Sequence, residues 1–355
     1  MKLIALILTL LLAACGGGGS PIAPLPANNL SLPINANQVP INLFNKTGVI
    51  APYSGLESTV IVENGLVRVW YTAEDYLNPS YAVGQANYGT TNYPFTNYRI
   101  SYMEATIGDF ATAVEAGTAI NWTNKGDCVH QLVHSQVYES NGVYNLIGWN
   151  MQTHTLDWWT SPTGNAGSWS LGSTNIVNLG LELGNTSFYF DGTNWNLYLE
   201  YHSNNMWLVS YWQGASLTTL SRLDSSSSPA MGGGSLSASA GQVIPFNGRF
   251  VSFSHTAYVP YTQTPTDISF WSSNNQASGW ALNSWVLRLQ DIGYFNGDKS
   301  LPFNDDSQIA DPTVFEINGK TYMMYETILT ERADIPSLSV AWWNAPLATV
   351  ISGYQ

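Results

Sequence analysis

Residues 310–326 read ADPTVFEINGKTYMMYE, in which two short apolar segments flank the dipeptide Asn318-Gly319. Asn-Gly between alternating apolar segments is a strong hairpin signal, because a type I′ turn requires positive φ at both central residues. The same pattern recurs four more times, with turns 50 to 77 residues apart, so the chain uses one structural unit five times. The other copies are ESTVIVENGLVRVWYT (57–72), HSQVYESNGVYNLIGW (134–149), GNTSFYFDGTNWNLYLEY (184–201) and AGQVIPFNGRFVSFSH (240–255), with turns at Asn64-Gly65, Asn141-Gly142, Asp191-Gly192 and Asn247-Gly248.

Each hairpin is followed by a further apolar or aromatic segment, which predicts a third strand in the same sheet. Three or four antiparallel strands repeated five times, with no helical pattern, predict an all-β fold, a five-bladed β-propeller. A β-helix would need shorter and more regular repeats, and a sandwich would not repeat its turn chemistry five times. The predicted third strands begin at Tyr98, Leu156, Trp207, Asp267 and Leu338.

The composition narrows the class of protein. The 355 residues are 45% hydrophobic and 13% aromatic but only 10% charged, which suits a large core and excludes a disordered chain. The net charge of −13 repels phosphate backbones, so we expect no nucleic-acid partner. A surface with few charges and much Trp, Tyr, Asn, Ser and Gly fits an exported protein that meets neutral carbohydrate.

The N-terminus has the pattern of an export signal. Lys2 precedes the apolar run Leu3–Leu12, which is too short to span a bilayer. The run ends in Leu12-Ala13-Ala14-Cys15, which resembles a bacterial lipobox and implies cleavage before Cys15 and lipidation of its thiol, as by palmitate. Gly16 then implies outer-membrane localisation in a Gram-negative cell envelope. The alternative is an ordinary signal peptide with a chance cysteine.

This reading divides the chain into three parts. Residues 1–14 form the lipoprotein signal peptide, 15–40 a lipid-anchored Gly/Pro-rich flexible tether, and 41–355 the propeller. We expect a monomer that meets the membrane only through its lipid. Once Cys15 is lipidated, Cys128 has no disulfide partner and is expected to be a small buried side chain.

The fold predicts where a site would lie. In a propeller, the first strand of each blade lines the central channel and the second runs antiparallel to it. The starts of first strands and the ends of second strands therefore meet on one face, which is the expected ligand pocket. Counting back seven residues from each turn gives Glu57, His134, Gly184 (with Asn185 next), Ala240 and Asp311, and the second strands end near Glu74, Trp149, Glu200, His255 and Glu326.

Two segments resemble the five-bladed propeller glycoside hydrolases, the arabinanase and β-xylosidase group and its invertase-like relatives. They are Asp311–Phe315 with the following turn and strand, and LDWWTSPTGNAGSW at 156–169. The likeness covers most of residues 55–345 and implies hydrolysis by two carboxyl groups, one protonated as the acid and one ionised as the base. In that family a first-blade Asp is the base, a second Asp tunes a pKa and a Glu is the acid. Carried onto this chain, the resemblance offers Glu57 or Asp311 as the base and Glu326 or Glu200 as the acid.

The chain also departs from that pattern, since His134, Asn185 and Ala240 stand at the intervening first-strand starts. The carboxylates have moved to other strands and loops, or the protein binds glycan without cutting it. A glycan-binding lipoprotein and a surface scaffold or adhesin therefore remain alternatives. His134, Asn185 and His255 are candidates to bind sugar hydroxyls, with an ion in the channel or a purely structural role as the alternatives for the two histidines. Trp149 and Trp158 are candidates to stack on sugar faces, with packing between blades as the alternative. No cofactor or metal is expected, although the acidic loop Asn304-Asp305-Asp306 could bind Ca²⁺.

Overall fold

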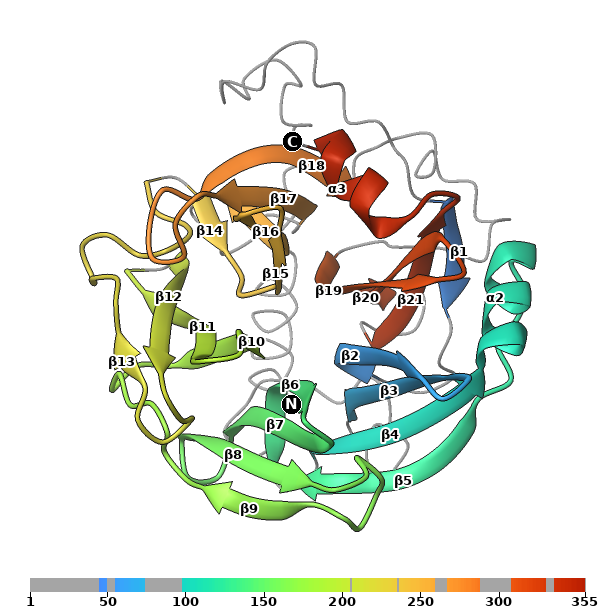
Figure 1. Cartoon of the computed structure of the whole chain (residues 1–355), viewed down its shortest axis with the longest axis horizontal. Helices are drawn as coiled ribbons and strands as arrows, with labels where there is room; N and C mark the ends of the chain where they lie inside the picture. Colours follow the sequence, from blue (N-terminus) through green and yellow to red (C-terminus); the bar gives the residue numbers. More distant parts are fainter. Residues whose placement is uncertain are drawn as a thin grey trace, which may run out of the picture. The chain divides into compact units, whose positions relative to one another are not determined.

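In the part of the chain that the structure describes, the strands form five antiparallel sheets arranged in a ring (Figure 1). The predicted five-bladed β-propeller is therefore confirmed. The computed structural model describes residues 45–49, 55–73, 98–204, 206–234, 236–258, 267–287, 308–329 and 335–354. All of these residues belong to the unit that spans residues 40–355. The predicted signal peptide, the tether and Cys15 lie outside them.

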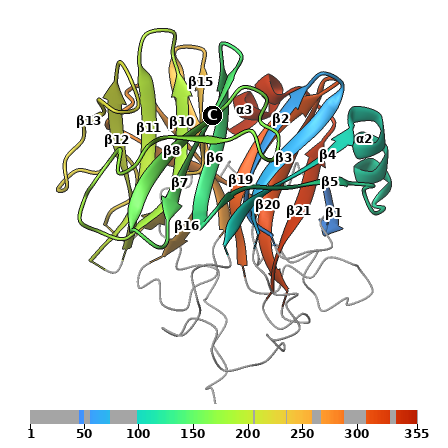
Figure 2. The same cartoon turned by 90° about the horizontal axis from the view of Figure 1, so that it is seen from below.

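Blades 1 to 4 each run from the axis outward in chain order (Figure 1), and Figure 2 shows their strands from the side, along their length. All five predicted third strands are present, as β4, β8, β12, β17 and β21. Blade 1 consists of β2 (Gly55–Glu63), β3 (Leu66–Ala73), β4 (Arg99–Thr106) and β5 (Thr123–His130), and blade 2 of β6 (Leu132–Ser140), β7 (Val143–Asn150), β8 (Thr155–Ser161) and β9 (Ser170–Ser173). Blade 3 consists of β10 (Leu183–Phe190), β11 (Trp195–Ser203), β12 (Met206–Gly214) and β13 (Ser221–Arg222). Blade 4 has β14 (Leu236–Ala238) and β15 (Gln242–Phe246) on its inner side, followed by β16 (Arg249–Tyr258), β17 (Asp267–Ser273) and β18 (Ala281–Leu287).

Blade 5 closes the ring with a strand from the other end of the chain. It consists of β19 (Gln308–Ile317), β20 (Lys320–Leu329), β21 (Ile335–Trp343) and β1 (Asn45–Val49). β1 pairs antiparallel with β21, with Asn45 opposite Trp342. The last blade therefore takes its outer strand from residues that precede the first blade, and blade 1 is held beside blade 5.

Four of the five predicted hairpin turns have the expected geometry. At Asn64-Gly65, for example, φ is 50° and 78°, and Glu63 pairs directly with Leu66. The prediction is wrong for Asp191-Gly192, because only Gly192 has positive φ there. Phe190 pairs with Trp195 across a four-residue loop. The Asp191 carboxylate accepts hydrogen bonds from the backbone N–H groups of Thr193 and Asn194, which stabilises this wider turn.

Among the described residues, two short helices accompany the five sheets of this all-β fold. α2 (Ile107–Ala116) begins at Thr106, whose hydroxyl accepts the Asp109 N–H, and ends at Gly117 with φ of 66°. Both capping signals are present in the sequence. The C-terminal helix α3 (Leu347–Tyr354) packs Val350, Ile351 and Tyr354 onto blades 4 and 5. No helix within the described ranges is long and apolar enough to cross a membrane.

The core lies between the blades. In the part of the chain that is described, the buried hydrophobic side chains form five clusters, one at each junction between neighbouring sheets. Each junction buries large apolar side chains, and full burial of one such side chain stabilises the fold by about 1.5–3 kcal/mol. Representative pairs are Val69 and Phe315, Ile100 and Leu146, Ile147 and Leu199, Tyr198 and Trp271, and Phe253 and Met323.

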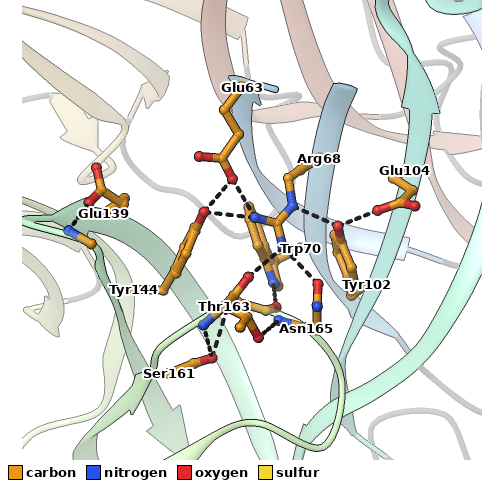
Figure 3. A network of polar contacts seen from close by, with 12 residues as sticks. Glu63, Arg68, Trp70, Tyr102, Glu104, Glu139, Tyr144, Ser161, Thr163 and Asn165 are labelled. Carbon is orange, nitrogen blue, oxygen red and sulfur yellow. Dashed lines mark hydrogen bonds and ion pairs between the residues drawn. The ribbon is translucent and has the colours of Figure 1, made fainter. Parts of the chain in front are cut away.

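Blades 1 and 2 are also joined by a polar network around Arg68, near the hairpin-turn end of β3 (Figure 3). The Arg68 guanidinium lies about 5 Å from the rings of Trp70, Tyr102 and Tyr144. Its nitrogens donate to the Tyr102 hydroxyl (2.6 Å), the Tyr144 hydroxyl (2.8 Å) and the Thr163 carbonyl (2.8 Å). The Arg68 guanidinium therefore links blade 1 to blade 2 through these contacts.

Candidate functional site

A β-bulge interrupts the inner strand of four blades at equivalent positions, at the end opposite the hairpin turn. The partner register shifts between Leu56 and Ser58 in blade 1 and between Ala310 and Thr313 in blade 5. Glu57, His134 and Asp311 lie in these bulges with φ of 34°, 54° and 50°. Non-glycine residues rarely adopt such angles, and strain of this kind concentrates at functional sites. In β6 the corresponding shift lies between Val133 and Gln136, and in β10 it lies between Leu183 and Thr186. In blade 4 the inner strand is interrupted between β14 and β15.

Three carboxyl groups meet around the axis. One oxygen each from Glu57, Asp311 and Glu326 lie within 4.8 Å of one another. Burial, the charges of Asp311 and Glu57, and a hydrogen bond to Asp311 raise the pKa of Glu326 well above its usual value. The raised pKa favours the protonated form of Glu326, which donates to Asp311. The same three oxygens could hold a metal ion, but an ion and the Glu326 proton would exclude one another.

Glu57 is held by His134 of the neighbouring blade. The His134 backbone N–H donates to Glu57 Oε2 (2.6 Å), and the imidazole Nδ1 contacts Oε1. The Thr72 hydroxyl also donates to Oε2 (3.1 Å). Although burial opposes a charged imidazole, the charge and hydrogen bond of Glu57 raise the pKa of His134 to about 9. Glu57 and His134 therefore form an ion pair at neutral pH.

Asp311 has an equivalent partner in His255. Nδ1 of His255 lies 2.8 Å from Asp311 Oδ1, and the Asn185 side-chain amide donates to the same oxygen (2.6 Å). Burial disfavours both charges, but each group stabilises the other, so the pKa of His255 is raised and that of Asp311 is lowered. Asp311 is the ionised member of its pair with Glu326, and it accepts from three side chains.

Glu200 lies on the other side of His255. Its Oε1 is 4.0 Å from His255 Nε2, and its Oε2 accepts from the Ser239 hydroxyl (2.9 Å) and the Asn185 N–H (3.0 Å). Burial raises the pKa of Glu200, and the positive charge of His255 partly offsets that rise. A Cβ at Gly184 would lie 2.9 Å from Glu200 Cδ, so glycine is needed for this carboxyl to fit.

The arrangement therefore pairs a protonated carboxylic acid with ionised carboxylates in a space largely shielded from water. Glu57, Glu200 and Glu326 are 6%, 2% and 4% exposed, whereas a third of the His134 side chain is exposed. A protonated acid beside an ionised carboxylate is the combination that general acid–base chemistry requires.

A small polar cavity of about 30 Å³ adjoins these bulges and is lined by the inner strands of all five blades. Glu57, Asn185 and Asp311 line it, together with Ser58, whose buried hydroxyl has no hydrogen-bond partner. The space suffices for water, which would satisfy that hydroxyl. The sequence predictions did not include Ser58, Thr72 or Ser239, because a lone hydroxyl residue in a strand carries no pattern.

The structure thus brings Glu57, Asp311, Glu326 and Glu200 close to the predicted binding residues His134, Asn185 and His255. The two predicted tryptophans differ. Trp149 lines a pocket together with His134, whereas Trp158 lies on the third strand β8, with its indole N–H on Asn145 (3.0 Å) and its ring against Gly172. Trp158 is therefore engaged within its blade and is not brought to the carboxyl groups.

Other polar predictions fall elsewhere. Glu74 and the acidic loop 304–306 lie outside the described residues. Cys128 is a free thiol that is partly buried, not fully buried as expected, and burial raises its pKa to about 12. Arg249, beside its hairpin turn, donates to Ser272 (3.0 Å), and Arg99 pairs with Asp127 (2.9 Å).

Several solved structures to which this chain is similar are glycoside hydrolases, although their sequences are very different. One described as a glycoside hydrolase superposes with a TM-score of 0.58 at 11% identity, covering 84% of this chain and 93% of its own. An endo-arabinase from Bacteroides thetaiotaomicron gives 0.55 at 12% identity, covering 85% and 97%. An α-L-arabinofuranosidase from Podospora anserina, in complex with cellotriose, gives 0.54 at 13% identity, covering 86% and 97%. The sequence matches no protein-family model and no curated protein. The likeness shows the shared fold of this chain and these hydrolases.

Proposed function

We propose that this protein is a glycoside hydrolase that cleaves neutral polysaccharide or oligosaccharide with its buried carboxyl groups. The observation that carries the proposal is the group Glu57, Asp311 and Glu326, whose oxygens lie within 4.8 Å of one another with Glu326 protonated. Glycoside hydrolysis needs one protonated and one ionised carboxyl group beside the scissile bond. The fold shared with arabinan- and arabinoside-cleaving enzymes supports the same chemistry.

The hydrogen bonds divide the roles. Glu326 is the general acid, because it carries a proton that burial and Asp311 hold in place. Glu200 is less suited, because both of its donors favour the ionised form. Asp311 accepts from several groups and tunes Glu326, which leaves Glu57 as the base that activates water. The net charge of −13 favours neutral over anionic glycans.

The test is reducing-sugar release from arabinan, arabinoxylan, xylan and β-glucan by wild type and the Glu326→Gln, Glu57→Gln and Glu200→Gln variants. Loss of a general acid is expected to lower kcat by about 10²–10⁴-fold in Glu326→Gln. An aryl glycoside with a good leaving group should be far less affected, because its departure needs no proton. Glu316→Gln, at an exposed position whose oxygen accepts the Leu347 N–H, is the matched control. The role of Glu326 is rejected if Glu200→Gln alone shows this leaving-group dependence.

A second function, glycan binding without cleavage, is favoured by one observation. Glu57 and Asp311 are each already paired with a histidine, which lowers their availability as bases. Binding measured by calorimetry on the same polysaccharides, with no sugar released by wild type, would establish this function instead.

We also propose that Cys15 anchors the protein to the outer membrane through a lipid. The Leu12-Ala13-Ala14-Cys15 sequence and the following Gly16 support this. Metabolic labelling with palmitate should mark the wild type and not Cys15→Ala. Equal labelling of both would disprove lipidation at Cys15.

A further inference from the structure

Beside the carboxyl groups lies a second and much larger cavity, between blades 2 and 3. Its volume is about 540 Å³, within the usual range for small-molecule sites. Trp149 of β7, His154 of the β7–β8 turn and residues from the segment that leads into the start of β10 form its walls. His134 also lines it, and the same side chain contacts Glu57 through Nδ1. The cavity and the proposed catalytic carboxyl groups therefore share one side chain as a wall.

The lining of this cavity is amphipathic. Trp149, Val177 and Leu183 are buried and give it apolar walls, while Asn178 and Glu182 are exposed polar residues at its edge. The His154 ring stands 6.0 Å from the Trp149 ring at an interplanar angle of 61°. A pyranose or furanose unit has the matching character, with an apolar C–H face and hydroxyl groups around its edge.

The charges of the lining select against acidic sugars. Glu182 is acidic, and the lining contains no lysine or arginine among the described residues. The positive charge of His134 is already neutralised by Glu57. A uronic acid would bring a carboxylate into a site whose described lining offers no lysine or arginine to compensate its desolvation.

We propose that this cavity binds a neutral sugar unit next to the glycosidic bond that is cut. The proposal rests on the proposed function, since it takes the bond to lie at the carboxyl groups. It follows that the protein recognises at least two linked sugar units, one at the carboxyl groups and one against Trp149. Monosaccharide glycosides would fill only the first position and bind more weakly.

The test fills the cavity without touching the carboxyl groups. Leu181 lines it and is 40% exposed, so Leu181→Trp adds bulk inside the cavity with little effect on the core. Leu223, 52% exposed, lies after β13 and does not line the cavity, so Leu223→Trp is the matched control. Binding of arabinobiose, xylobiose and cellobiose, and of the corresponding monosaccharides, is measured by calorimetry in the Glu326→Gln background, which keeps substrates intact.

We expect at least one disaccharide to bind about tenfold more tightly than its monosaccharide. Leu181→Trp should abolish that difference, and Leu223→Trp should retain it. His154→Ala, which removes one edge of the cavity, is expected to weaken disaccharide binding by about 3–10-fold. Equal affinity for mono- and disaccharides, no binding of any probe, or an unchanged disaccharide affinity in both cavity variants would overturn the proposal.

The design separates this proposal from the proposed function. Disaccharide binding that Leu181→Trp removes, in a protein that releases no sugar, would support the cavity and reject the hydrolase. Sugar release by wild type with disaccharide binding unaffected by Leu181→Trp would do the reverse.

Discussion

The ion pair between His134 and Glu57 makes a quantitative prediction about stability and pH. Folding raises the pKa of His134 from 6.5 to about 9, so the folded state binds this proton more tightly than the unfolded state. At about 1.4 kcal/mol per tenfold change in affinity, the contribution is at most about 3.5 kcal/mol. Because 33% of the side chain is exposed, solvent screening lowers the expected value to about 1–2 kcal/mol.

The sign follows from the direction of the change. This stabilisation is fully present below pH 6.5 and is lost as the pH rises through about 9. Urea unfolding at pH 6, 7, 8 and 9 should therefore show a free energy of unfolding that falls by about 1–2 kcal/mol more in wild type than in His134→Gln. The difference between the two proteins isolates His134, since the raised pKa values of His255 and Glu326 give both a slope of the same sign.

The control is His130→Gln, which replaces an exposed histidine at the end of β5 and should keep the wild-type slope. The reasoning would be refuted if His134→Gln and wild type lost stability in parallel from pH 6 to 9. Parallel curves would mean that His134 is not charged in the folded state.

Two further predictions concern the junction of blades 1 and 2. Arg68→Met should lower the free energy of unfolding, measured in urea, by about 3–5 kcal/mol, because it leaves Glu63 without its cation. Combining Arg68→Met with Glu63→Gln should recover part of that loss. If the effects of the two substitutions on the free energy of unfolding were fully additive, the pairing would be contradicted. Gly164→Ala places a Cβ 2.8 Å from the Trp70 ring at a φ of 71°, so we expect the free energy of unfolding in urea to fall by about 1–3 kcal/mol. Gly167→Ala is the control, because Gly167 also has positive φ but lies in open space, and the free energy of unfolding should fall by less.

The sequence was sufficient for the fold because its turn chemistry determines strand register. Where two residues close the hairpin, as at Asn64-Gly65 and Asn318-Gly319, counting back seven positions reaches the bulge residues Glu57 and Asp311. Register fixes which side chains face the axis, so the convergence of distant residues could be predicted without any contact information.

In blade 3 the same count still reaches the bulge at Gly184, but the two additional residues of the Asp191 loop displace the second strand relative to the sequence pattern. Ala310 pairs with Glu326 in blade 5, but the equivalent Leu183 pairs with Tyr201 in blade 3, and Glu200 lies opposite the bulge. Glu200 and Glu326 are therefore not equivalent positions, although the sequence offers both as acids. The Asp-Gly dipeptide alone does not reveal whether the hairpin closes with a two-residue turn or, as here, with a wider loop that the Asp191 side chain stabilises.

The protonation states could not be predicted from the sequence. They depend on pairs that come together only when the ring forms, such as His134 with Glu57, 77 residues apart, and Asp311 with His255, 56 residues apart. They depend equally on burial, which gives Glu326 its proton and is a property of the packed blades. A carboxyl residue at a strand end does not reveal which state it will adopt.

Ring closure and the carboxyl site are therefore linked physically. Glu57 comes from blade 1 and Asp311 and Glu326 from blade 5, so their oxygens approach only when these two blades pack together. That junction is stabilised by the apolar cluster that joins the two sheets, while β1 completes blade 5 from the start of the propeller. Two like charges and a third acid brought this close oppose closure, and the histidines from blades 2 and 4 offset that repulsion. All five blades thus contribute to the charge balance of one site, since blade 3 supplies Glu200 beside His255 and Asn185, which donates a hydrogen bond to Asp311.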